Sequence, residues 1–291
     1  GIGPGEVLAV LTGGGSATHQ DLVLGFRLPR LLLASILGGG LALAGATFQA
    51  LLRNPLAEPY ILGVSGGAAV GAVLVLALGL TTIASWSLPL AAFAGALLAI
   101  AIVFRVATAA GRALDVRVLL LAGVVTGAFF SAVISFVLAV SDARTVRSAV
   151  LWMMGSTAGA DWKTVSVAAV YTIPTALVLI GLARPLNTLA VGEETALYLG
   201  TEVERVKRIA FAGASLVTAA GVAVAGVIGF VGLVVPHALR LVVGSDHRIL
   251  LPLCFLVGAA FLTTADTLAR VLLSPTEIPI GVVTAFVGVP I

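Results

Sequence analysis

Long uncharged runs of hydrophobic residues recur along the chain and set its predicted elements. Such runs occupy residues 31–52, 118–141, 164–183, 209–236 and 249–265, and another begins at residue 278. Roughly 20 apolar residues in a helix are enough to cross the hydrocarbon core of a bilayer. Each run therefore predicts a membrane-spanning α-helix.

Residues 59–104 form one stretch without a charged side chain, and it is too long for a single span. The stretch is interrupted at residues 79–89, where glycine, proline and several hydroxyl residues are typical of a turn. Trp86 lies in this turn, and tryptophan is enriched at membrane interfaces. We therefore predict two spans here, near residues 60–80 and 88–104.

Residues 209–236 can be interpreted in two ways. They could form one long span, or a span that ends near Gly229 and is followed by a short return helix over residues 231–241. An internal repeat helps to choose between the two. The sequence Gly-Leu-Ala-Leu-Ala-Gly at residues 40–45 recurs as Gly-Val-Ala-Val-Ala-Gly at residues 221–226.

A second pair of similar stretches extends the repeat. Gly-Val-Val-Thr occurs at residues 123–126 and again at residues 281–284. Counting the short helix places both pairs five spans apart, so both repeats have inverted orientation. Without the short helix, one pair is five spans apart and the other four, so the two repeats would differ in relative orientation. We therefore predict the short helix and an inverted duplication, which in transporters places the pathway between the halves.

Positive charge is distributed unevenly between the two faces that this span count defines. Cytoplasmic loops carry an excess of Lys and Arg. Ten such residues lie on one face: Arg53, Arg105, Arg112, Arg117, Arg184, Arg205, Lys207, Arg208, Arg240 and Arg248. Six lie on the other: Arg27, Arg30, Arg144, Arg147, Lys163 and Arg270. The first face is predicted to be cytoplasmic.

Composition supports a membrane protein and limits its chemistry. Sixty per cent of the 291 residues are hydrophobic and 10% are charged, whereas a soluble domain is about 25% charged. The net charge of +3 comes without a basic cluster, so no nucleic-acid partner is expected. Neither lysine follows a glycine, which excludes a phosphate-binding P-loop. We expect no catalytic residue and no metal site in this chain.

One charged internal segment and one weak motif suggest functional sites. Residues 193–200 predict a short helix, with Glu193 and Glu194 at its N-terminal end and Gly200 as its C-terminal cap. Its apolar residues favour a docking surface for a cytoplasmic partner over a solvated loop: Ala196, Leu197 and Leu199.

Separately, Ser65 in a Gly-x-Ser-Gly pattern, with His237 as a base, would suit a rhomboid-like intramembrane serine protease.

An ion-coupled secondary transporter is the other alternative. Such carriers often use an intramembrane acid, because a buried carboxylate is costly and is kept for function. Asp266 is the nearest candidate, but Arg270 lies four residues further along the same predicted helix. We therefore interpret Asp266 and Arg270 as a helix-end ion pair.

Several ordered motifs resemble those of the FecCD family, the permeases of type II ABC importers for iron–siderophore, haem and cobalamin. The resemblance runs from about Arg27 to the end of the chain. It rests on Arg-Leu-Pro-Arg at 27–30, the stretch from 45 to 59, Leu-Gly-Val-Ser at 62–65, Trp-Met-Met-Gly at 152–155, Gly-Phe-Val-Gly-Leu-Val-Val-Pro-His at 229–237, Asp-His-Arg at 246–248 and Ile-Pro-Ile-Gly-Val-Val-Thr at 278–284.

The resemblance implies an all-α permease fold of ten helices, of which this chain is expected to lack the first and most of the last. It implies one permease domain in a homodimer, with two ATP-binding cassette subunits that bind ATP and Mg²⁺ and a periplasmic or lipid-anchored binding protein. Our expected divisions are external segments 1–30 and 142–163, repeat halves 31–141 and 209–291, and a linking span with a coupling segment at 164–208. The expected location is the inner, cytoplasmic membrane of a bacterium or archaeon.

The resemblance also implies roles for individual residues. Arg27, Arg30 and Arg270 are expected to meet acids of the binding protein, and Glu193 to Gly200 to form the coupling helix on the ATPase. The cytoplasmic gate is expected at these residues: Asn54, Leu56, Asp115, Val116 and Arg117. The family's cobalamin permease has small hydroxyl residues at the last two positions. A ferric siderophore is our first substrate expectation because siderophores are the most frequent substrates of the family, with haem and cobalamin next. The pathway wall is expected from residues 31–52, 60–80 and 118–141.

Overall fold

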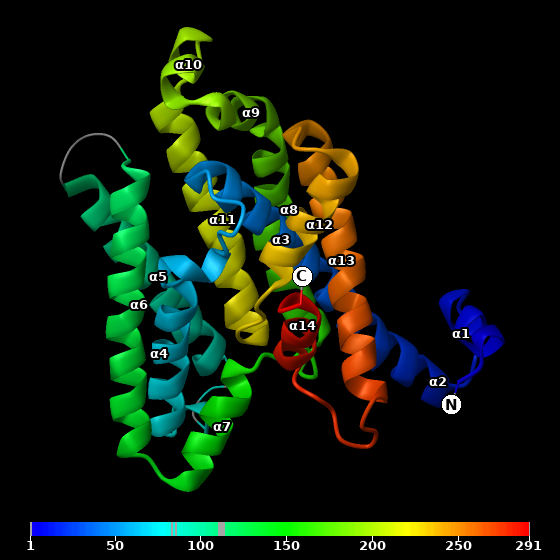
Figure 1. Ribbon diagram of the computed structural model, residues 1–291. Coiled ribbons are helices and arrows are strands. Elements are labelled where there is room, and N and C mark those ends of the chain that lie inside the picture. The colour runs from blue at the N-terminus through cyan, green and yellow to red at the C-terminus, as the bar shows by residue number, and fades with distance from the viewer. Residues whose placement is uncertain (1, 83, 85, 110–113, 291) are drawn as a thin grey trace.

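The computed structural model describes residues 2–290 except 83, 85 and 110–113, so Arg112 lies outside the described residues. The described chain folds as a bundle of helices (Figure 1). In chain order these are α1 (Pro4–Leu11), α2 (Ala17–Gln20), the π-helix η1 (Asp21–Arg27), α3 (Leu28–Leu52), the 3₁₀-helix η2 (Pro59–Leu62), α4 (Val64–Ala77), the 3₁₀-helix η3 (Leu80–Thr82), α5 (Ser87–Ala109), α6 (Val116–Ala139), α7 (Ala143–Met153), α8 (Trp162–Gly181), α9 (Ala183–Val191), α10 (Glu193–Tyr198), α11 (Val203–Ala225), α12 (Val231–Val243), α13 (His247–Val271) and α14 (Ile280–Gly288).

Six helical segments in the described chain are long and apolar enough to cross a membrane. They contain α3, α5, α6, α8, α11 and α13, which are the long spans expected from the hydrophobic runs. Helices α4 and α12 are apolar but shorter, with 14 and 13 residues. At 1.5 Å per residue each of them is about 20 Å long, which is less than the hydrocarbon thickness.

The predicted interruption near Gly229 is confirmed. Helix α11 ends at Ala225, its C-terminal cap Gly226 has a positive φ of 72°, and α12 begins only at Val231. Figure 1 shows α11 descending to this break and α12 turning back toward the end from which α11 came. Residues 209–236 are therefore a span and a short return helix.

The two halves run in opposite directions. In Figure 1 α3 ascends while α11 descends, and α6 descends while α14 ascends. The short helices α4 and α12 occupy corresponding places, because each follows the helix that carries the repeated glycine sequence. This arrangement is the inverted repeat predicted from the two pairs of similar stretches.

The connections gather at two ends of the bundle (Figure 1). We call the end that carries α9, α10 and the α12–α13 turn the upper end. The lower end carries α7, the α13–α14 connection and the N-terminal helices α1 and α2. The span count predicted from the sequence gives this same grouping.

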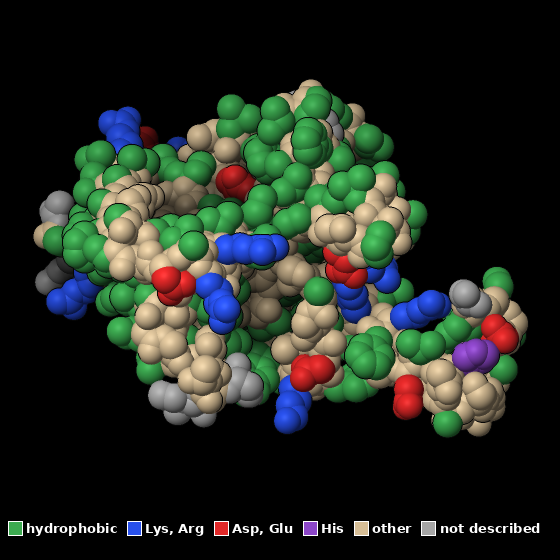
Figure 2. Space-filling view, turned by 90° about the horizontal axis from the view of Figure 1, so that it is seen from below, with side chains coloured by type: hydrophobic (Ala, Val, Ile, Leu, Met, Phe, Trp, Pro, Cys, Tyr) green, Lys and Arg blue, Asp and Glu red, His purple; other side chains and the backbone are tan. Residues whose placement is uncertain are grey.

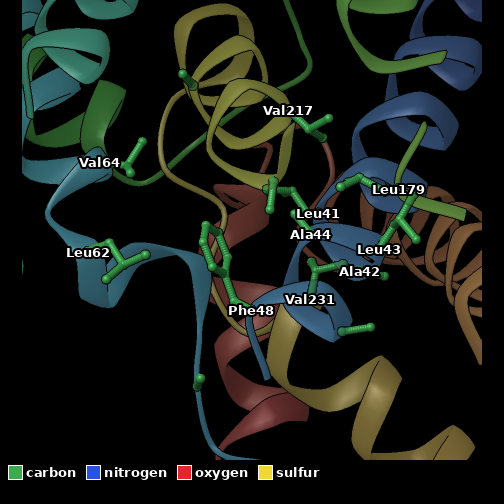
Figure 3. Close-up of a cluster of buried hydrophobic side chains, with 14 of the residues drawn as sticks. Leu41, Ala42, Leu43, Ala44, Phe48, Leu62, Val64, Leu179, Val217 and Val231 are labelled. Carbon is green, nitrogen blue, oxygen red and sulfur yellow. The ribbon is translucent and has the colours of Figure 1, made fainter. Parts of the chain in front are cut away.

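Helix α3 forms the centre of the protein. Every residue from Leu37 to Leu52 is buried. Figure 3 shows side chains of α3, including Phe48, among side chains from η2, α4, α8, α11 and α12. The ring of Phe48 packs edge-on against Phe211 of α11, with 6.3 Å between ring centroids.

Glycines let α3 approach its neighbours closely. A Cβ atom added to Gly45 would lie 1.9 Å from the carbonyl oxygen of Gly232 on α12. A Cβ atom at Gly38 would lie 2.2 Å from the carbonyl oxygen of Gly258 on α13. Small residues allow this backbone-to-backbone packing between membrane helices.

The burial of α3 overturns one expectation about the transport pathway. We predicted that residues 31–52 would line it, but the side chains of residues 37–52 are enclosed by helices of the same chain. The hydrophobic run of α3 therefore reflects a helix buried inside the protein. A run of apolar residues cannot by itself distinguish such a helix from one that lines a cavity.

We predict that Gly45→Ala destabilises the protein and Gly221→Ala does not. The new methyl group at Gly45 must push α12 away, and overpacking of this kind typically costs about 1–3 kcal/mol. At Gly221 of the repeated sequence, the nearest atoms to an added Cβ lie at an ordinary 3.6 Å. Thermal unfolding in detergent should show a lower midpoint for Gly45→Ala alone. Equal midpoints for the two variants would contradict the close packing of α3.

Candidate functional site

The break between α11 and α12 is held by two side chains from the first half. The Glu58 carboxylate accepts a hydrogen bond of 2.6 Å from the backbone N–H of Phe230. The Tyr60 hydroxyl donates to the carbonyl of Ile228 at 3.0 Å and accepts from the N–H of the same residue at 3.2 Å. Backbone groups that leave a helix away from water need such partners.

Both short helices begin at a residue in the left-handed conformation. Gly63 precedes α4 with φ 75°, and Phe230 precedes α12 with φ 68°. A non-glycine residue in this conformation costs roughly 1–2 kcal/mol, and such strain is concentrated at functional sites. Paired short helices at corresponding places in two inverted halves point to the binding region of a transporter.

An apolar cavity of about 550 Å³ lies beside this break. Phe230 and Val227 of the break, Met153 and Met154 at the end of α7, and Phe286 of α14 are among its lining residues. Phe286 is itself exposed. Helix α6 also presents a row of exposed large side chains: Leu121, Val124, Val125, Phe129 and Phe136. The faces of α6 and α14 are therefore among the exposed apolar surfaces of the two halves.

Helix α10 projects from the upper end. Some of its side chains face the rest of the protein, and the others face outward. Ala196 is buried, and Glu193 forms an ion pair with Arg53 at 3.2 Å and another with Lys207 at 3.1 Å. Glu194 is exposed, as is a continuous apolar stretch made of Leu197, Tyr198 and Leu199, with Tyr198 91% exposed. Gly200 ends this segment with φ 79°.

The residues of the predicted docking segment thus fall into two groups, one facing the protein and one facing outward. Glu193 and Ala196 hold α10 to the protein, whereas Glu194, Leu197 and Leu199 face outward. Tyr198, which the sequence-based prediction did not include, is the most exposed of the apolar residues in α10. An exposed apolar stretch at the tip of a projecting helix is suited to a partner protein.

Polar contacts fix the platform from which α10 projects. Asn187 of α9 donates a hydrogen bond of 2.7 Å from Nδ2 to Asp246, and its Oδ1 accepts from the backbone N–H of His247 at 2.9 Å. Hydrogen bonds from the Arg248 side chain hold the pKa of Asp246 far below its usual range. Since a charged acceptor strengthens these bonds, α9 is firmly tied to the start of α13.

The predicted gate residues lie in two segments at the upper end, residues 54–56 and 115–117, which we call the gate segments. Asn54 accepts a hydrogen bond of 3.0 Å from the backbone N–H of Leu56, which leaves the Leu56 side chain exposed. Asp115 caps α6 by accepting from the backbone N–H of Arg117 at 2.8 Å. Arg117 is exposed and Val116 half-buried.

A cavity of about 460 Å³ joins the second gate segment to the base of α10. Residues 115–117 line it, together with Arg53, Glu193 and Lys207. Arg53 directly precedes the first gate segment and has a left-handed backbone with φ 47°. The structure therefore brings both gate segments and the docking segment into one region, although they are far apart in the sequence.

The lower end carries an ion-pair network around Asp266, which is only 2% exposed. Arg30 binds Asp266 with a shortest distance of 2.9 Å and binds Glu277 at 2.9 Å. Arg270 pairs with Asp266 at 3.2 Å, and the hydroxyl of Thr157 also donates to it. Figure 2 shows acidic and basic side chains around a hollow on this end.

This network gives Arg30 partners within the chain, whereas the sequence predicted a contact with a binding protein. All three nitrogens of its guanidinium are bound by carboxylates of this chain, and its side chain is only 14% exposed. The expected pair of Asp266 and Arg270 is present but is part of this larger network. Arg27 is exposed and Arg270 is partly exposed, so these two remain open to a partner.

The residues of the protease alternative lie on different helices. Ser65 lies in the first turn of α4, and His237 lies in the middle of α12. Among the described residues, no hydrogen bond joins them. Their geometry therefore lacks the hydrogen-bonded pair that activates a serine nucleophile.

Sequence reasoning missed several residues that organise these sites. Glu58 lies in the motif stretch 45–59 and Tyr60 begins the predicted span 60–80, and neither was assigned a role, although an acid between apolar spans was the available signal. The side chain of Gln49 lies in the last turn of α3, where it donates to the carbonyls of Ala57 and Gly232 at 3.2 Å and accepts from Arg240. Long-range pairs of this kind depend on helix packing, which a single sequence does not display.

Comparison with known proteins agrees with this architecture. The family model of the FecCD transport family matches residues 1–291. The cobalamin import system permease protein BtuC of Halobacterium salinarum is 48% identical, over 94% of this chain and 72% of that protein. The vitamin B12 import system permease protein BtuC of Escherichia coli is 44% identical, over 91% of this chain and 80% of that protein.

A solved structure shares the fold over nearly the whole chain. It is described as "An inward-facing conformation of a putative metal-chelate type ABC transporter" and has a TM-score of 0.87 at 35% identity. The match covers 94% of this chain and 87% of the other. The fold is that of an ABC importer permease, and the chain belongs to the FecCD transport family.

Proposed function

We propose that this chain is the permease subunit of an ATP-driven importer that moves cobalamin from a binding protein into the cytoplasm. The observation that carries the proposal is the 48% identity, over 94% of this chain, to a cobalamin import permease. The inverted halves, the broken helix and the projecting α10 support the same function. In this proposal the upper end faces the cytoplasm and the lower end faces outward, in the inner membrane of a bacterium or archaeon.

A ferric siderophore is the second candidate substrate. Val116 and Arg117 are the observation that favours it, because cobalamin permeases resemble this chain elsewhere but have small hydroxyl residues there. The structure described as a metal-chelate type transporter is consistent with either substrate. The identity to relatives named for cobalamin is our reason for proposing cobalamin before a siderophore, which reverses the order favoured by the sequence alone.

The apolar surfaces support a homodimeric arrangement. The exposed faces of α6 and α14, together with the apolar cavity beside the break, would lie on the axis between two permease copies. A wall of apolar and small side chains suits a bulky chelate, because it offers few strong contacts that would retain the substrate. The pathway then runs between the copies from the lower end to the gate segments.

The partner surfaces lie at opposite ends. We propose that Leu197, Tyr198 and Leu199 enter a groove on one of two ATPase subunits, which bind the ATP and Mg²⁺. Arg27 and Arg270 would meet carboxylates of a binding protein at the lower end. An ion-coupled carrier would use neither partner, so dependence on ATP separates the two kinds of transporter.

The substrate proposal predicts ATP-dependent uptake of cobalamin. In vesicles that contain the permease and its ATPase, radiolabelled cyanocobalamin should accumulate when the binding protein is outside and ATP is inside. Excess ferrichrome should leave this uptake unchanged. Uptake of ferrichrome but not of cobalamin would show that the substrate is a siderophore, and uptake without ATP would contradict an ATP-driven importer.

The surface of α10 predicts that Leu197→Asp weakens capture of the ATPase at least tenfold, which corresponds to about 1.4 kcal/mol. The new carboxylate would be buried in the contact without a partner, and such burial is costly. Co-purification of the ATPase with the permease measures the effect. Leu273→Asp is the matched control, because Leu273 is 62% exposed and Leu197 is 60% exposed, but at opposite ends. Equal capture by the two variants would show that α10 does not bind the ATPase.

The exposed Arg27 predicts that Arg27→Glu lowers affinity for the binding protein at least tenfold. A charge reversal places two carboxylates together, and like-charge contacts across an interface are strongly unfavourable. Binding of the labelled binding protein to the reconstituted importer measures the effect, which should shrink at high salt. Arg144→Glu reverses another exposed charge at the lower end as a control. Unchanged affinity for Arg27→Glu would remove Arg27 from the docking surface.

A further inference from the structure

A buried lysine at the upper end connects segments to which the proposed function assigns different tasks. Lys207 lies near the start of α11, and its side chain is only 3% exposed. Its ammonium group is 3.1 Å from Oε2 of Glu193 and 3.0 Å from Oε1 of Glu204. Lysine is almost never this buried unless it is paired, so these two contacts hold it in place.

Each glutamate uses its second oxygen to reach the chain next to a gate segment. Oε1 of Glu193 is 3.2 Å from the guanidinium of Arg53, which directly precedes Asn54. Oε2 of Glu204 accepts a hydrogen bond of 2.9 Å from the backbone N–H of Leu114, which directly precedes Asp115. A single connected series of polar contacts therefore runs from one gate segment to the other through Lys207.

This series also passes through α10. Glu193 is the first residue of α10, so any movement of that helix displaces the carboxylate shared by Arg53 and Lys207. The cavity of about 460 Å³ lies against Arg53, Glu193, Lys207 and the second gate segment. It leaves room for these side chains to shift without first breaking a close-packed apolar core.

We propose that Lys207 is a positioning residue that transmits movement of α10 to the second gate segment, while Glu193 acts on the first gate segment through Arg53. The inference rests on the proposed function, in which α10 contacts the ATPase. Lys207 and its two glutamates act as a charged joint: a displacement of Glu193 pulls Arg53 directly, and pulls Leu114 through Lys207 and Glu204. One helix can then move two gate segments that come from different parts of the chain.

A purely structural role would have a different signature. If the ion pairs only stabilised the fold, their loss would reduce assembly and all activities together. If Lys207 transmits movement, its loss should leave α10 bound to the ATPase. The second gate segment should then no longer respond to movement of α10. The informative quantity is therefore the amount of ATP hydrolysed for each substrate molecule transported.

The test uses Lys207→Met in the assembled importer with its ATPase and binding protein, reconstituted in vesicles. We expect cyanocobalamin uptake to fall at least tenfold and the ratio of ATP hydrolysed to substrate moved to rise at least fivefold. Lys207→Arg keeps the charge and should restore the ratio to within about threefold of the unsubstituted protein. Lys163→Met makes the same chemical change at the other lysine, which is exposed at the lower end, and should leave the ratio unchanged.

Hydrogen exchange of the assembled importer locates the defect without depending on the identity of the substrate. In the unsubstituted protein, a non-hydrolysable ATP analogue should alter the protection of residues 193–198 and of both gate segments. In Lys207→Met the changes at residues 193–198 and 54–56 should persist, while the change at residues 115–117 should be lost.

Two results would overturn the proposal. In the first, residues 115–117 of Lys207→Met respond to the analogue as in the unsubstituted protein. In the second, residues 193–198 lose their response together with the gate, which would give Lys207 only a structural role. Failure of the proposed function is distinguishable from both, because residues 193–198 of the unsubstituted protein would then show no protection when the ATPase is present.

Discussion

The structure depends on one constraint, which is that backbone N–H and C=O groups away from water must find partners within the protein. The break between α11 and α12 exposes such groups, and Glu58 and Tyr60 supply their hydrogen bonds from the opposite half of the chain. The break is therefore possible only while the two halves are packed together. This requirement couples the inverted repeat to a segment where the chain leaves regular helix inside the bundle.

The same packing assigns different tasks to helices of similar composition. Helix α3 is enclosed by its neighbours and gives the bundle a rigid centre, whereas α6 and α14 present exposed apolar side chains, which the proposed importer uses to face the pathway. The polar contacts are concentrated at the two ends, around Asp266 at the lower end and Lys207 at the upper end. In the proposed importer, a rigid apolar bundle thus lies between two charged ends that meet soluble partners.

Much of the fold could be predicted from the sequence, because length and hydrophobicity determine a membrane span almost alone. The paired glycine stretches even identified the short helix α12, which hydrophobicity left ambiguous. The burial of α3 and the internal ion pairs of Arg30 could not be predicted in this way. Both depend on which faces of the helices meet, and uniformly apolar runs such as residues 31–52 carry no such signal. The outward residues of α10 were predicted in part, since charge marked the segment but not the inward direction of Glu193 and Ala196.

The central claim is that α11 and α12 form a span and a return, so that the α12–α13 turn lies at the same end as α10. Labelling with a membrane-impermeant maleimide tests it most directly, in right-side-out vesicles and in a Cys254→Ser background that removes the one buried cysteine. Ser245→Cys should be labelled only after the membrane is permeabilised, whereas Lys163→Cys should be labelled without permeabilisation. Labelling of Ser245→Cys in sealed vesicles would show that residues 209–236 cross the membrane once, and would contradict the inverted repeat.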